Sequence, residues 1–186
     1  MILVIDCGSN KTRFIEDIVD EFMDVKHGKL LDFSVVDLTG VKGVILSGAP
    51  ILITEIDPQP YIDKMNWILK TEIPVLGICF GHQIIGLMHG ASGSKMKADR
   101  DWQIIEAFED CELFNRLPNE VQMMEDHCES ISIPPGFNLI ASSDACINEV
   151  MQHQDKLIFG VQFHPEVSGN HGRIVIENFI KICQKE

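Results

Sequence analysis

The sequence lacks the features that mark membrane and nucleic-acid-binding proteins. No apolar run approaches the ~20 residues that cross a bilayer, and the first residues lack the basic stretch of a signal peptide. Basic residues are scarce, with 15 Lys and Arg against 28 Asp and Glu, for a formal net charge of −13. Such a charge repels nucleic acids and acidic membranes at long range. We therefore expect a cytoplasmic protein without a membrane or nucleic-acid partner.

Metal-binding and disulfide patterns are also missing. The six cysteines are dispersed through 186 residues, and a chain of this length buries roughly 70% of its unfolded surface without disulfides. No CxxC pair or short Cys/His cluster has the spacing of a structural zinc site. His82 and His89 share one face of an expected helix, but no third ligand is nearby. We expect reduced thiols and no bound metal.

The two common phosphate-binding motifs are absent as well. Neither G-x(4)-G-K-[ST] nor G-x-G-x-x-G occurs, and the glycine-containing segment 90–95 fits neither. We therefore expect no cofactor in this chain, and we expect that it does not activate a substrate with ATP by itself.

Short apolar runs do alternate with helical patterns, and no linker or repeat interrupts them. This alternation is typical of an α/β fold. We predict one domain over 1–186, with a three-layer, mostly parallel (flavodoxin-like) sheet, helices on both faces and some additional antiparallel strands. The expected central strands are 2–5, 43–46 and 75–78, and the expected helices are 14–22, 61–69, 81–89 and 174–183. Shorter strands are expected at 104–105, 121–124, 139–140, 149–151 and 157–161.

The segment 74–83 predicts a strand, a sharp turn and a helix, with Cys79 at the turn. Gly77 and Gly81 stand two residues before and after the cysteine, so the strand and helix backbones can approach closely around a strained turn. The turn projects its side chain at the carboxyl edge of the sheet, where the helix N-terminus favours a thiolate. Cys79 is a candidate nucleophile, although an inert core thiol beside a tight turn fits the same pattern.

A second buried strand ends at His164, and Pro165 prevents its continuation. Glu166 follows two residues later, where a turn can bring its carboxylate to the imidazole and fix the histidine tautomer. The 85 residues between Cys79 and His164 are no obstacle, because the carboxyl ends of parallel strands share one edge. A capped surface histidine would fit His164 alone, but the joint occurrence favours a catalytic triad.

Small residues follow another central strand, at positions 47–50. Their backbone N–H groups, those of Gly48 and Ala49 among them, can point at a carbonyl oxygen beside the nucleophile. Together with the N–H of Phe80 they would form an oxyanion hole, in which each donor is worth roughly 3 kcal/mol. An ordinary turn is the alternative interpretation.

These segments resemble the class I (triad) glutamine amidotransferases, with 77–83 matching the nucleophile turn and 161–166 the histidine and glutamate motif. Within this family the chain is most similar to the separate glutaminase subunits of GMP synthases. The supporting segments are 4–10, 47–50, 126–129, 135–137 and 160–167. Where the family has Ser-Gly-Gly-Pro, this chain has alanine at position 49. If that position required a positive φ, the alanine would cost on the order of 1 kcal/mol.

The resemblance implies hydrolysis of L-glutamine to glutamate and ammonia through a thioester at Cys79, with His164 as acid and base and Glu166 orienting it. It also implies that Gln83 and the backbone near Asp126 and His127 hold the amino-acid end of glutamine. The ammonia would pass to a separate ATP-dependent synthetase (ATP-pyrophosphatase) subunit, which would carry the ATP and Mg²⁺, most simply for the amination of XMP to GMP.

Other functions remain open at this stage. A γ-glutamyl peptide hydrolase shares the triad but needs no synthetase, and an amidotransferase of another amination pathway would use a different acceptor. An α/β-hydrolase fits less well, because its acid precedes the histidine in the chain. A catalytically silent, glutamine-binding regulatory homologue is disfavoured by the presence of Cys79, His164 and Glu166.

Overall fold

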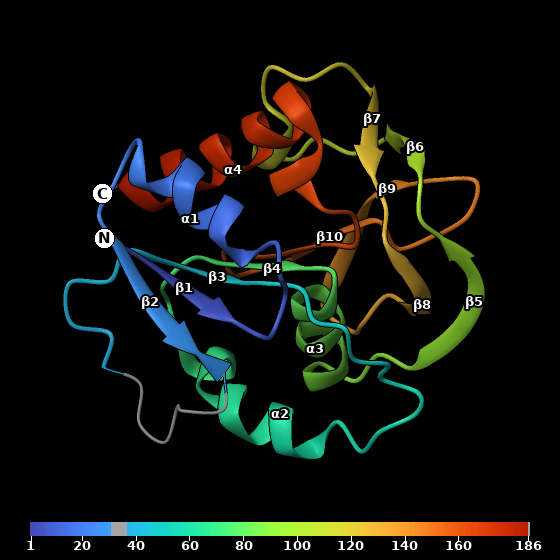
Figure 1. Ribbon diagram of the computed structural model, residues 1–186, viewed down its shortest axis with the longest axis horizontal. Helices are drawn as coiled ribbons and strands as arrows, with labels where there is room; N and C mark the ends of the chain where they lie inside the picture. Colours follow the sequence, from blue (N-terminus) through green and yellow to red (C-terminus); the bar gives the residue numbers. More distant parts are fainter. Residues whose placement is uncertain (31–36, 186) are drawn as a thin grey trace.

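The computed structural model describes residues 1–30 and 37–185, and a nine-stranded sheet runs through its centre (Figure 1). The strands lie in the order β2-β1-β3-β4-β11-β10-β9-β6-β7. The first five pair in parallel and are β1 (Ile2–Asp6), β2 (Val25–Lys29), β3 (Gly43–Leu46), β4 (Val75–Ile78) and β11 (Ile158–Val161). The other four extend the sheet in antiparallel pairs and are β6 (Trp102–Ala107), β7 (Glu120–Met124), β9 (Phe137–Ser142) and β10 (Val150–His153).

Helices cover both faces of this sheet, as the three-layer prediction requires (Figure 1). On one face lie α1 (Thr12–Asp20) and α4 (Gly169–Gln184), and on the other α2 (Gln59–Met65) and α3 (Phe80–Met88). Each face has its own apolar cluster, because four of the five parallel strands, β1, β3, β4 and β11, are buried on both sides. The predicted α/β class and its layers are confirmed.

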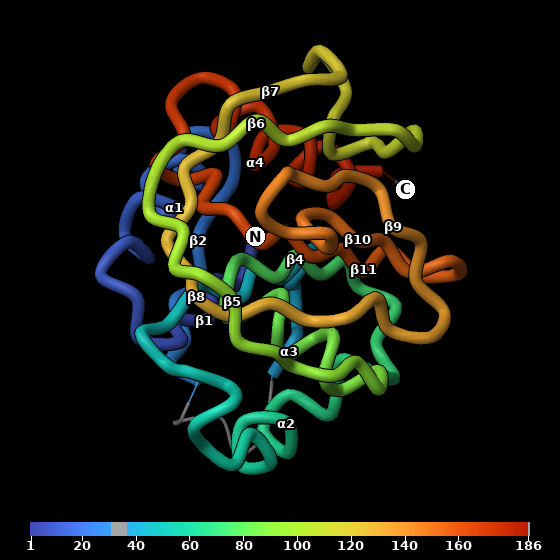
Figure 2. The backbone as a smooth tube through the Cα atoms, turned by 90° about the vertical axis from the view of Figure 1, so that its right-hand side faces the viewer, coloured from blue at the N-terminus to red at the C-terminus, as the bar shows by residue number. Residues whose placement is uncertain are grey.

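A short second sheet stands beside the carboxyl ends of the parallel strands. It pairs β5 (Gly93–Asp99) with β8 (His127–Ile131), and Figure 2 shows these two strands side by side. Three 3-10 helices complete the described structure, at Asn66–Lys70, Glu112–Phe114 and Pro165–Val167. The second sheet and the loop before β8 form one wall of the pocket described below.

Three predicted helices differ from the structure, and the last, expected at 174–183, begins five residues earlier because α4 spans Gly169–Gln184. The other two were drawn too long. The pattern at 14–22 extends too far, because α1 ends at Asp20 and Phe22 is 44% exposed. The pattern at 61–69 is divided into α2 and a 3-10 helix, which leaves Leu69 on the surface. In both cases an apolar residue continued the helical spacing without joining the core.

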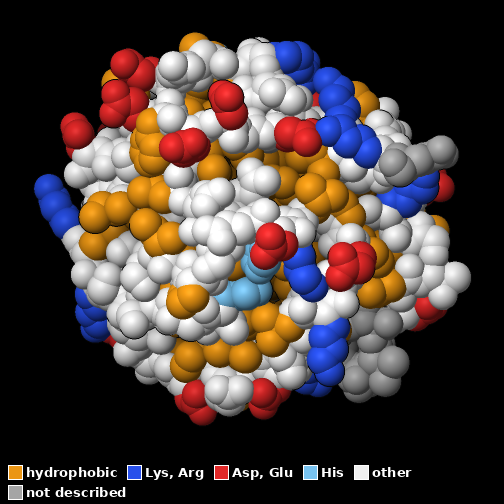
Figure 3. All heavy atoms as spheres, turned by 180° about the vertical axis from the view of Figure 1, so that it is seen from behind, with side chains coloured by type: hydrophobic (Ala, Val, Ile, Leu, Met, Phe, Trp, Pro, Cys, Tyr) orange, Lys and Arg blue, Asp and Glu red, His pale blue; other side chains and the backbone are white. Residues whose placement is uncertain are grey.

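The surface seen in Figure 3 carries acidic and basic side chains interspersed with apolar ones. Among the helices that the structure describes, none has the length and apolar character needed to cross a membrane. All six cysteines are free thiols.

Candidate active site

Cys79 occupies a strained position between β4 and α3. Its φ is 51° and its ψ −105°, a left-handed conformation that costs a non-glycine residue about 1–3 kcal/mol. Two backbone hydrogen bonds hold the turn: the N–H of Cys79 donates to the carbonyl of Val161 (2.9 Å), and its carbonyl accepts from the N–H of Gln83 (3.0 Å). The predicted sharp turn at the helix N-terminus is confirmed.

The two glycines around Cys79 permit the close approach that the sequence predicted. A Cβ atom on Gly77 would lie 2.5 Å from the backbone carbon of Gly81. A Cβ atom on Gly81 would lie 2.6 Å from the carbonyl oxygen of Leu46. Neither position can therefore carry a side chain unless the backbone moves.

His164 reaches Cys79 because their strands are neighbours. β11 pairs in parallel with β4, with Val161 opposite Ile78, so the residues after both strands meet at one edge. The imidazole Nδ1 of His164 lies 2.8 Å from Oε1 of Glu166, and both side chains are buried. The same imidazole interacts electrostatically with the Cys79 sulfur. The structure thus brings the three predicted residues together, and their catalytic roles stay a prediction.

The environment of His164 favours its protonated form. Burial by itself would lower the pKa of this imidazole, but its interactions with the Cys79 sulfur and the Glu166 carboxylate outweigh burial and raise the pKa to about 10. An imidazolium beside a thiol at a helix N-terminus stabilises the thiolate. The site therefore sets a positively charged imidazole beside the candidate nucleophile.

The loop 47–50 follows β3, on the other side of Cys79. The Ser47 hydroxyl fixes it by accepting from the N–H of Cys7 (2.9 Å) and donating to the carbonyl of Gly48 (3.0 Å). A Cβ on Gly48 would lie 3.0 Å from the His164 ring, so the loop runs directly beside the catalytic pair. Ala49 is not among the positive-φ residues of the described chain, so its alanine carries no left-handed strain. The oxyanion hole of Ala49, Phe80 and Gly48 stays a prediction.

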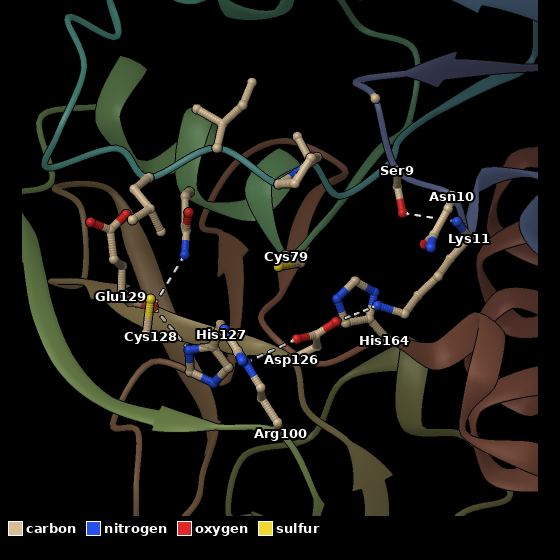
Figure 4. Close-up of a pocket in the computed structure, with 16 residues that line it drawn as sticks. Ser9, Asn10, Lys11, Cys79, Arg100, Asp126, His127, Cys128, Glu129 and His164 are labelled. Atoms are coloured by element: carbon tan, nitrogen blue, oxygen red, sulfur yellow. Dashed lines mark hydrogen bonds and ion pairs between the residues drawn. The ribbon is translucent and has the colours of Figure 1, made fainter.

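Cys79 and His164 open into a pocket of about 440 Å³ (Figure 4). This volume lies within the range of small-molecule sites, about 300–1,000 Å³. The walls come from the loops after β1 and β3, from α3 and from the segment around β8. Three residues predicted to bind substrate also line it, namely Gln83, Asp126 and His127.

These three residues face the pocket in different ways. The side-chain N–H groups of Gln83 are hydrogen-bonded within the protein. They donate to the carbonyl of Glu129 (3.2 Å) and to Oε1 of Gln162 (3.1 Å). Asp126 lies at the mouth and is 2.6 Å from Nζ of Lys11. His127 is buried, with Nδ1 2.9 Å from the carbonyl of Glu129. Gln83 and His127 therefore shape the wall, whereas Asp126 presents charge.

Sequence reasoning missed three residues at the site. Lys11 and Arg100 both line the pocket and approach the Asp126 carboxylate, Arg100 at 3.6 Å (Figure 4). The Gln162 side chain donates to Sγ of Cys79 at 3.7 Å. Lys11 follows β1 at the carboxyl edge of the sheet, which is a signal that could have found it. Arg100 lies between β5 and β6, where no motif points to the site.

The thiols of this chain should differ sharply in reactivity. Burial raises the pKa of Cys7, Cys111, Cys146 and Cys183, which keeps these thiols protonated. We expect haloacetamide at neutral pH to label Cys79 first, and the His164→Asn variant to lose roughly tenfold or more of that labelling rate. Peptide mass spectrometry measures the rates.

The labelling experiment needs one control, because Cys128 also lines the pocket. It is therefore run in a Cys128→Ser background. Equal labelling rates with and without the His164 imidazole would contradict the inference that His164 stabilises the Cys79 thiolate.

Comparison with known proteins agrees with this geometry. The family model for class I glutamine amidotransferases matches residues 3–183. The glutamine-hydrolyzing GMP synthase subunit of Pyrococcus furiosus is 38% identical over 145 residues, covering 76% of each chain. The corresponding subunit of Methanocaldococcus jannaschii is 37% identical over 147 residues, covering 77% of this chain and 74% of that one.

Solved structures of similar proteins share the fold of this chain. A crystal structure assigned to a GMP synthase subunit of Thermoplasma acidophilum superposes with a TM-score of 0.89 and 33% identity, covering 98% of this chain and 92% of that one. A glutamine amidotransferase from Thermotoga maritima shares the fold, with a TM-score of 0.77, 20% identity, and coverage of 98% and 83%. The chain belongs to the class I glutamine amidotransferase family.

Proposed function

We propose that this chain is a glutaminase that hydrolyses L-glutamine to glutamate and ammonia. The observation that carries the proposal is the strained Cys79 beside the buried His164–Glu166 pair, at the floor of an open pocket. The thiolate attacks the carboxamide carbon, and the N–H groups of Ala49 and Phe80 hold the developing oxyanion, with Gly48 beside them.

Collapse of the resulting tetrahedral intermediate breaks the C–N bond and leaves a γ-glutamyl thioester. The leaving nitrogen takes a proton from His164 and departs as ammonia. The neutral imidazole then removes a proton from water, which attacks the thioester and releases glutamate and the Cys79 thiolate. Glu166 keeps the imidazole oriented through both steps.

The remainder of the pocket fits an amino acid. The backbone near Asp126 and His127, together with Gln83, would hold the α-amino and α-carboxylate groups. Lys11 and Arg100 add positive charge at the mouth, on both sides of Asp126. The mouth thus presents both signs of charge to a zwitterionic substrate.

We further propose that the ammonia serves the amination of XMP to GMP on a separate ATP-dependent synthetase subunit. The curated relatives are named as glutamine-hydrolyzing subunits of GMP synthase, and these names support this acceptor. ATP and Mg²⁺ would then be bound by the partner, and this chain would carry no cofactor or metal. We place the reaction in the cytoplasm and assign the whole of 1–186 to one amidotransferase domain.

The test measures glutamate release from glutamine by this chain, alone and with a GMP synthase ATP-pyrophosphatase subunit, ATP, Mg²⁺ and XMP. We expect glutamine hydrolysis, and formation of GMP only when both subunits are present. Hydrolysis without GMP formation would contradict the XMP acceptor and favour another amination pathway. Faster turnover of γ-glutamyl peptides than of glutamine would favour the peptide hydrolase, and absence of any turnover with the partner would contradict the glutaminase.

A further inference from the structure

A buried cluster of acidic side chains and a histidine lies behind the pocket wall. Glu125 follows β7, His127 begins β8 and Glu149 precedes β10, and one potential donor or acceptor atom from each lies within 4.8 Å of the other two. Their exposed fractions are 1%, 7% and 0%. The reaction as derived above uses neither Glu125 nor Glu149.

The hydrogen bonds of the cluster are incomplete unless it carries extra protons. The His127 Nδ1 donates to the carbonyl of Glu129, so the neutral ring presents a lone pair at Nε2. That lone pair faces Oε2 of Glu125 at 3.1 Å. Both oxygens of Glu125 and Oε2 of Glu149 have no hydrogen-bond donor, whereas Oε1 of Glu149 accepts from the Ser143 hydroxyl (2.7 Å).

No lysine or arginine among the described residues pairs with the two carboxyl groups, although the His164 imidazolium acts on Glu125 electrostatically. Neither Glu125 nor Glu149 forms an ion pair with lysine or arginine in residues 1–30 and 37–185. Two ionised carboxylates in this dry environment would repel each other. Other titratable groups that act on the cluster electrostatically are Asp99 from β5, His82 from α3, Cys146 and His164.

The cluster is connected to three segments of the active site by backbone hydrogen bonds or by adjacency in the chain. Met124, next to Glu125, accepts from the N–H of His164 (2.9 Å). Asp126, at the pocket mouth, lies between Glu125 and His127. The carbonyl of Glu149 accepts from the N–H of Gln162 (2.8 Å), the residue whose side chain contacts Cys79.

We propose that Glu125, Glu149 and His127 share two protons at neutral pH, and that the resulting neutral cluster positions the glutamine-binding wall and the strand end that carries His164. One proton joins His127 Nε2 to Glu125, and the other, carried by Glu149, is donated to the second oxygen of Glu125. Glu125 and Glu149 are positioning residues, because they act on the site through the backbone.

The direction of the pKa shifts agrees with this arrangement. Burial raises the pKa of Glu125 to about 8, and burial together with the charge of Glu125 raises the pKa of Glu149 well above its usual range. The cluster therefore keeps its protons at pH 7 and loses one as the pH rises through about 8. The Glu125 carboxylate then faces the Nε2 lone pair of His127 with no proton between them, and their repulsion should loosen the wall and weaken glutamine binding.

The test uses the Cys79→Ala protein, which binds glutamine without reacting. We expect its Kd for glutamine, measured by calorimetry, to rise roughly tenfold between pH 7 and 9. In Cys79→Ala/Glu125→Gln the amide can donate to Nε2 of His127, accept from the Glu149 carboxyl group and cannot titrate, so the rise should be at least threefold smaller. Titration of the glutamine amine is common to both proteins and cancels in the comparison.

Parallel pH curves for the two proteins would overturn the inference. An infrared band of a protonated carboxyl group, present in the folded parent at pH 7 and lost on alkaline titration, supports it even if the double variant does not fold. Absence of that band, or one equivalent of tightly bound zinc in the purified protein, would overturn it. The inference rests on the proposed function, but the two fail differently: a lack of glutamine binding at every pH contradicts the function, whereas the infrared band still decides the cluster.

Discussion

Replacement of Cys79 by alanine should lower the rate of glutamate release by at least about 10⁴-fold, because no other group in the pocket is placed to form the thioester. Alanine retains the Cβ and therefore the strained backbone, so the unfolding free energy should stay within about 1 kcal/mol of wild type. Glutamine binding should persist. Glutamate release with the synthetase present, thermal unfolding and calorimetry measure the three quantities.

The matched control is Cys128→Ser, which removes the other thiol that lines the same pocket. We expect its rate to remain within about threefold of wild type, because Cys128 has no imidazole partner among its described hydrogen bonds. A Cys79→Ala protein that folds and still releases glutamate at a tenth of the wild-type rate would contradict the assignment of the nucleophile.

Replacement of Gly81 by alanine should destabilise the fold, although alanine is the better helix former. Helix propensity favours the substitution by about 1 kcal/mol. The new Cβ would lie 2.6 Å from the carbonyl oxygen and 2.7 Å from the Cβ of Leu46, and relief of that overlap should cost about 3 kcal/mol or more. The steric effect therefore dominates. Denaturant unfolding measures the net loss, about 2 kcal/mol or more, or an insoluble protein.

Gly93→Ala serves as the control for this substitution. Its Cβ would meet a terminal methyl of Ile53 at 2.9 Å, and a side-chain methyl can move where a backbone carbonyl cannot. We expect a change within about 1 kcal/mol. If Gly81→Ala were as stable as Gly93→Ala, the close approach of α3 and β3 would not be a constraint on this fold.

The strands buried on both faces could be predicted from sequence because they are continuous apolar runs. β1, β3 and β4 are of this kind, and their bounds agree closely with the expected ones. β2, β5 and β8 were missed. VKHGK, GSKMKAD and HCESI are largely polar segments, and none of them is a continuous apolar run. Their pairing is decided by tertiary contacts.

The triad could be predicted because each of its members follows a central strand and has a local motif. The Gly77–Gly81 spacing identified the turn. Pro165 identified the end of the strand only roughly, because β11 ends at Val161 and His164 lies three residues beyond it. Lys11, Arg100 and Gln162 escaped prediction because their roles depend on where loops fold back in space. The Glu125–His127–Glu149 cluster escaped for the same reason, since Glu125 and His127 lie where β7 leads into β8, whereas Glu149 lies between β9 and β10.

The most direct test of the account is capture of the covalent intermediate. The protein is mixed with glutamine and the synthetase subunit with its substrates, quenched in acid within the first turnovers, and digested for mass spectrometry. We predict a γ-glutamyl group on the peptide that contains Cys79, absent from Cys79→Ala. Steady release of glutamate with no adduct on Cys79, or with an adduct on another residue, would contradict the central claim.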